Sequence, residues 1–167
     1  MQTISRNDQV ASWTVLHPEA NDHFPQADDN ALVLSRTFNG IRILLLSDLG
    51  RLGQAALAER TPDLRADIVV TGLPVKPDAV DEALLAAINP KVIIVADSEF
   101  PVSERATKVL CNRLAQHSVP VIYTRITGAV SIEFRDQEWE LYTMSGMKIS
   151  SRSLRAVSRQ TGKAERR

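Results

Sequence analysis

Residues 41–57 read IRILLLSDLGRLGQAAL. The apolar run predicts a buried strand at 41–47, and the segment that follows predicts a helix at about 51–60. Asp48 stands at the junction of the two. A carboxylate at the end of a buried strand can be a metal ligand, or it can cap the next helix. These alternatives for Asp48 lead to different functions.

Strands and helices are expected to alternate on both sides of this stretch. Asn39-Gly40 favours a tight hairpin turn between strands at 31–38 and 41–47. The segments at 67–72 and 91–97 are apolar on both faces, which is typical of central strands covered on both sides. The other expected elements are strands at 12–18, 119–124, 128–134 and 138–144 and helices at about 78–88 and 103–117. Together they predict an α/β fold, with a mixed sheet and flanking helices.

The composition fits one globular domain, since the chain has 167 residues of which 44% are apolar. No apolar run approaches the roughly 20 residues of a membrane-spanning helix, and the N-terminus has no stretch typical of a signal peptide. A single cysteine, Cys111, suits a reducing compartment. We therefore expect a soluble, cytoplasmic chain, or the soluble domain of a membrane protein.

The net charge of zero hides a basic C-terminus, because residues 148–167 hold seven Lys or Arg against Glu165. We expect residues 1–147 to form the domain and 148–167 to be a disordered, solvated tail. Such a tail can also contact nucleic acid or an anionic surface by releasing counterions. The rest of the chain lacks basic residues interleaved with aromatic ones, so the domain itself is not expected to bind nucleic acid.

The order of segments over residues 12–134 resembles that of a known family. The segments are VLHP, DDNALVL, ILLLSDLG, RADIVVTG, NPKVIIVAD and VIYTRITGAVSIEF. They resemble the second half of the metallo-β-lactamase-fold domain in ComEC-type DNA-internalisation competence proteins. Asn30, Ser47-Asp48, Thr124 and Gly128 resemble residues of that family's motifs. The resemblance implies one half of an αββα sandwich.

The chain departs from this family where the family binds metal. The family's His-His-Gly-Ser motif would follow Gly72, where this chain has Leu73 and Pro74. A later His-Pro of the family matches Phe100-Pro101, and the HxHxDH motif belongs to a first half that this chain does not contain. Asp48 is left as a vestigial metal candidate without a complete site. We therefore expect no catalytic residues and no cofactor, and we expect Ser47 or Asp48 to cap the helix instead.

Other candidate residues have plain structural explanations. His17 and His23 stand near three aspartates, Asp22, Asp28 and Asp29, but two histidines six residues apart in a polar loop lack fixed geometry, so these residues are expected to be solvated. His117 suits a helix end, and Cys111 suits a buried position on a helix. Gly50-Arg51-Leu52-Gly53 has the context of a phosphate cradle, but it matches no phosphate-binding motif.

Three functions remain open at this stage. The first is a non-catalytic, ComEC-like module for assembly or interaction, linked to a protein of DNA uptake. The second is a metal-dependent nuclease or phosphodiesterase whose ligands come from a missing N-terminal half, and the third is a small-molecule binder at the carboxyl ends of the strands. Leu73, Pro74 and Phe100 favour the first, because a supplied half would meet apolar groups where imidazoles are needed. We expect a protein partner or a second copy to cover an apolar face of the sheet.

Overall fold

The computed structural model describes residues 3–5, 10–75 and 79–154. It has an α/β fold with a mixed six-stranded sheet, called here the main sheet, and a three-stranded antiparallel sheet, called the small sheet. In spatial order the main sheet holds β3 (Thr14–His17), β4 (Val33–Phe38), β5 (Ile41–Ser47), β6 (Ile68–Thr71), β7 (Val92–Val95) and β8 (Val121–Tyr123). The small sheet holds β11 (Lys148–Ser150), β10 (Glu138–Thr143) and β9 (Val130–Arg135). The fold class predicted from the sequence is confirmed.

The main sheet combines a hairpin half with a parallel half. β3, β4 and β5 pair antiparallel, and β5, β6, β7 and β8 pair parallel. The hairpin turn is at Asn39 and Gly40, which both have positive φ, as a tight turn of this kind requires. The carboxyl ends of the four parallel strands therefore lie at one edge of the sheet. A separate short pair, β1 (Thr3–Ser5) and β2 (Val10–Ser12), precedes the main sheet.

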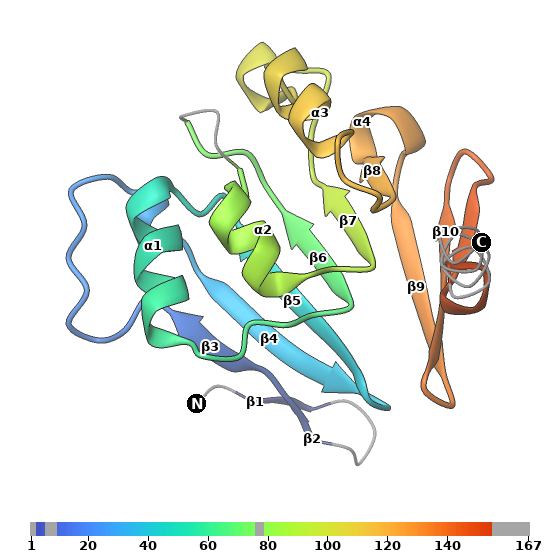
Figure 1. Ribbon diagram of the computed structural model, residues 1–167, viewed down its shortest axis with the longest axis horizontal. Helices are drawn as coiled ribbons and strands as arrows, with labels where there is room; N and C mark the ends of the chain where they lie inside the picture. The colour runs from blue at the N-terminus through green and yellow to red at the C-terminus, as the bar shows by residue number, and fades with distance from the viewer. Residues whose placement is uncertain (1–2, 6–9, 76–78, 155–167) are drawn as a thin grey trace, which may run out of the picture.

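Helices cover one face of the main sheet (Figure 1). They are α1 (Arg51–Arg60), α2 (Glu82–Ile88) and α3 (Lys108–Leu114), with short turns η1 (Asp28–Asn30), η2 (Val102–Glu104) and α4 (Thr124–Thr127) at strand ends. Leu57, Leu84 and Leu110 from the three helices pack with Leu44 and Val69 of the sheet in one buried cluster. Alternate residues of the strands point into this cluster, so their neighbours must face the other side.

The small sheet covers much of this opposite face, called here the rear face. Trp139 and Leu141 of β10 are buried against Ile43, Ile68 and Ile122 of the main sheet. The sequence predicted that both faces of the strands would be covered, and it assigned one apolar face to a protein partner or a second copy. Over the area under β9, β10 and β11 this assignment is corrected, because the chain's own C-terminal strands cover it.

The basic tail begins later than the predicted boundary at residue 148. β11 pairs with β10 over Lys148–Ser150. Ile149 and Leu154 pack against the buried residues between the two sheets, which we call the rear-face cluster and which include Trp139 and Leu141. Residues 148–154 therefore belong to the folded body, and the predicted disorder of 155–167 concerns residues outside the described ones.

The α3 helix is shorter than the predicted 103–117, because η2 and a turn occupy its first part. Within the described ranges no helix has the length and hydropathy needed to cross a membrane.

Candidate functional site

The carboxyl edge of the parallel strands gathers the residues that the sequence singled out. Asp48 directly follows β5, Leu73 and Pro74 follow β6, and Phe100 follows β7. β5, β6 and β7 are adjacent and parallel, so these residues share one edge. Gly72 holds two of the loops together, since its N–H donates to the Ser47 carbonyl at 2.6 Å.

Asp48 lies at this edge on the surface of the protein. Its side chain is exposed, and it accepts a hydrogen bond from the Ser47 hydroxyl at 3.0 Å. Phe100 is 77% exposed, so an apolar ring points to solvent after β7. Among the residues that the structure describes, no group of three or more His, Cys, Asp or Glu is placed to hold a metal ion. A hydrolytic zinc site needs at least three ligands that converge on the ion.

The cap of α1 is Asp29, which corrects the prediction that Ser47 or Asp48 would cap this helix. The N–H groups of Leu52 and Gly53 donate to Asp29 Oδ1 at 2.9 and 3.4 Å. Asp29 is only 3% exposed, and a carboxylate at this position also stabilises the helix dipole. The sequence missed Asp29 because it lies in η1, more than twenty residues before the helix that it caps.

The glycines of the 50–53 segment allow this cap to form. A Cβ added to Gly53 would lie 2.6 Å from the Asp29 carbonyl oxygen, and one added to Gly50 would collide with the Asp29 carboxylate. The two glycines therefore let η1 approach the start of α1. The amides that a bound phosphate would use are already occupied by a side chain of the same protein.

His17 is buried, which corrects the expectation of a solvated loop residue. Its Nε2 lies 2.8 Å from the Asp29 carbonyl oxygen, and its Nδ1 lies 2.9 Å from a guanidinium nitrogen of Arg60. A carbonyl accepts and a guanidinium donates, so in these two contacts the imidazole donates from Nε2 and accepts at Nδ1. Asp22 completes the group at 2.7 Å from Arg60, whose guanidinium lowers the pKa of the Asp22 carboxyl. His23 is exposed, as predicted.

A second polar group at the carboxyl edge was not found from the sequence. The Asp97 side chain is fully buried and accepts from the N–H of Arg125 at 2.9 Å and from Arg125 Nε at 3.2 Å. Glu99 pairs with both Arg125 and Arg105. The Thr124 hydroxyl links the same strand ends through the N–H and carbonyl of Asp97. These contacts tie the ends of β7 and β8 together, and Asp97 raises the pKa of Arg125 by its hydrogen bond.

The remaining sequence candidates have structural roles. Cys111, for which the sequence predicted a buried position, is partly buried and packs against the cluster between the helices and the main sheet. Burial raises the pKa of Tyr123, and the neighbouring Cys111 adds to this effect. His117 follows α3 and lies 3.1 Å from Glu82, whose pKa it lowers.

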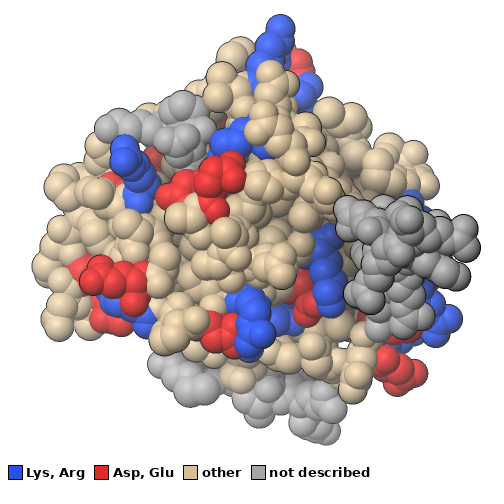
Figure 2. Space-filling view, viewed as in Figure 1, with Lys and Arg blue, Asp and Glu red and all other residues tan. Residues whose placement is uncertain are grey.

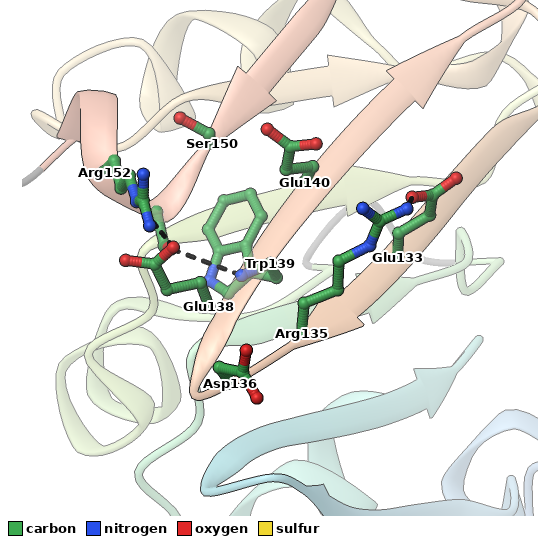
Figure 3. A pocket seen from close by; sticks show the side chains of 9 residues that line it. Glu133, Arg135, Asp136, Glu138, Trp139, Glu140, Ser150 and Arg152 are labelled. Carbon is green, nitrogen blue, oxygen red and sulfur yellow. Dashed lines mark hydrogen bonds and ion pairs between the residues drawn. The ribbon is translucent and has the colours of Figure 1, made fainter.

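A hollow of about 350 Å³ lies on the small sheet (Figure 3). Glu138 forms an ion pair with Arg152 at 2.6 Å on one side of Trp139, and Glu133 forms one with Arg135 at 2.9 Å on the other side. Glu140 lies 2.9 Å from Lys148, and the Tyr142 hydroxyl and this ammonium lower the Glu140 pKa. Because these carboxylates are paired with cations, the hollow has the character of a salt-bridged surface.

Exposed apolar side chains follow the carboxyl edge from α1 to the small sheet. We call them the apolar rim: Leu52, Val75, Phe100, Val102, Ile126 and Met144, each at least 52% exposed. The loops that carry them are neighbours, since Pro74 and Leu52 line one cavity, and Val75 and Arg105 line another. The Ser145 N–H donates to the Thr127 carbonyl at 3.0 Å, which joins α4 to the turn of Met144. Scattered exposed apolar residues are ordinary, whereas a run along one edge is typical of a contact surface.

The charges on the helix-covered face are mixed. Figure 2 shows Lys and Arg side chains beside Asp and Glu side chains on this face, and neither sign forms a broad patch of its own. A footprint for nucleic acid would need a stripe of positive charge.

Neither models of known protein families nor characterised proteins give a match to this chain.

Proposed function

We propose that this chain is a non-catalytic relative of the metallo-β-lactamase-type domain of ComEC-like proteins, and that it serves as an interaction or assembly module in a protein of the DNA-uptake type. The observation that carries the proposal is the composition of the carboxyl edge. Asp48 remains there, while Leu73, Pro74 and Phe100 occupy the positions that resemble the family's imidazole ligands.

The apolar rim supports the interaction half of the proposal. Hydrolysis needs polar groups that converge on a substrate and a metal, whereas protein contact favours exposed apolar and aromatic side chains surrounded by charge. Phe100, Val102 and Ile126 lie beside the ion pairs of Arg105 and Arg125, which matches this arrangement.

Metal analysis of the purified chain tests the proposal. We expect less than about 0.1 equivalent of zinc or manganese after dialysis against the metal, because a structural zinc site needs four ligands and a catalytic one three. The matched control is Asp48→Ala, which should bind the same amount as the original chain. About one equivalent of metal that is lost in Asp48→Ala, together with metal-dependent phosphodiesterase activity, would overturn the non-catalytic assignment.

A further inference from the structure

A row of apolar side chains crosses the rear face of the main sheet, and in the described part of the chain it is fully buried at one end only. Val15, Leu34, Leu45, Val70, Ile94 and Ile122 are successive cross-strand partners from β3 to β8. Ile94 and Ile122 are 4% and 1% exposed, and Val15 at the other end is 52% exposed. Leu34, Leu45 and Val70 between them are only partly buried. The cover of the rear face therefore ends part-way along this row.

β9 marks the place where the cover ends. It starts after α4 at the carboxyl end of β8, and near its other end Phe134 stacks on Phe38 of β4 with ring centroids 5.0 Å apart. β9 thus runs diagonally across the rear face. The inward side chains of β9, among them Ile132, are partly buried, whereas Trp139 and Leu141 of the next strand are 1% and 0% exposed.

The outer edge of β9 is open. β9 pairs with β10 along Val130–Arg135, and within the described part of the chain its backbone N–H and C=O groups have no other strand to pair with. A six-residue edge strand presents about half of these groups outward, so about six hydrogen-bonding groups point away from β10. An open strand edge therefore lies beside a half-covered apolar row.

We propose that β9 accepts a β-strand from a second, different polypeptide, which extends the small sheet over Val15, Leu34, Leu45 and Val70. A strand added about 4.8 Å beyond β9, in a sheet packed about 10 Å from the main sheet, lies above this row. The strand alternates apolar side chains facing the row with polar side chains beside Ser131 and Glu133, which face outward on β9. This inference rests on the proposed interaction function and adds a contact site apart from the apolar rim, together with its mode of binding.

A second copy of this chain does not fit the site. Two copies joined edge to edge through β9 would form one continuous small sheet with both main sheets on the same side of it. In the placement proposed above, the β3 to β6 half of the first main sheet lies beneath the space beyond β9. The second copy's main sheet would need that space, so the occupant is a strand without a sheet of this kind beneath it.

Peptide binding to the full chain tests the site. The probe is a fluorescein-labelled peptide of eight residues in which valine alternates with threonine and lysine, and fluorescence anisotropy measures its affinity. We expect saturable binding that Val15→Asp weakens at least about 10-fold. The matched control is Val109→Asp on α3, since Val109 is 71% exposed on the helix side, and it should change the affinity less than about 2-fold. Amide hydrogen exchange should show protection by the peptide in β9 and none in β11.

The proposal is overturned if the peptide does not bind, if Val15→Asp binds it as well as the original chain does, or if the protected amides lie in β11. It is also overturned if sedimentation shows a dimer that Val15→Asp disperses, because the occupant is then a second copy. Metal bound at Asp48 would overturn the proposed function without changing these outcomes, and a failed peptide test would leave the metal result unchanged.

Discussion

At the scale of single residues, Asp29 organises the carboxyl edge more than Asp48 does. We predict that Asp29→Ala lowers the free energy of unfolding by about 2 kcal/mol, because it removes the buried carboxylate that accepts hydrogen bonds from two amides at the start of α1. Asp48→Ala is the matched control and should cost no more than about 0.5 kcal/mol, since its side chain is exposed. Urea unfolding of both variants measures the difference. A larger loss of unfolding free energy in Asp48→Ala than in Asp29→Ala would show that Asp48 caps α1, as the sequence favoured.

At the scale of elements, β11 is the strand that the sequence assigned to the tail. We predict that a chain ending after Val157 keeps its melting temperature within about 2 °C, and that a chain ending after Met147 loses several degrees. The second truncation removes β11, opens the edge of β10 and uncovers part of the rear-face cluster, which Ile149 and Leu154 help to close. Differential scanning calorimetry compares the two chains. Equal melting temperatures would show that β11 adds nothing to the fold.

At the scale of the whole molecule, local patterns predicted the elements and could not predict how distant segments meet. The hairpin at Asn39-Gly40, strand 41–47 and helix 51–60 agree with the structure, because turn chemistry and hydrophobic periodicity are local properties. Asp29 and His17 were assigned to a solvated loop, since their partners stand many residues away in α1. The sequence also could not predict which strands cover the rear face. Period-2 alternation in β9 and β10 predicts a half-buried sheet, but it does not say which surface the buried side of that sheet packs against.

The last prediction concerns whether the two sheets unfold together. The main sheet and the small sheet share one buried cluster, in which Trp139 packs against Ile68 and Val92, so we expect a single cooperative transition. The chain has two tryptophans, which report on different parts of the fold. The ring centroids of Trp13 and Phe38 are 6.1 Å apart, so Trp13 reports on the main sheet, whereas Trp139 lies in the small sheet. In the single-tryptophan variants Trp13→Phe and Trp139→Phe, the fluorescence midpoint in guanidinium chloride should match the midpoint of the helical circular dichroism measured on the same variant. Comparing two probes within each variant removes the stability change caused by the substitution itself. If the fluorescence of Trp139 changes at lower denaturant than the dichroism, the small sheet detaches first, and the cover of the rear face is a separable layer and not part of one core.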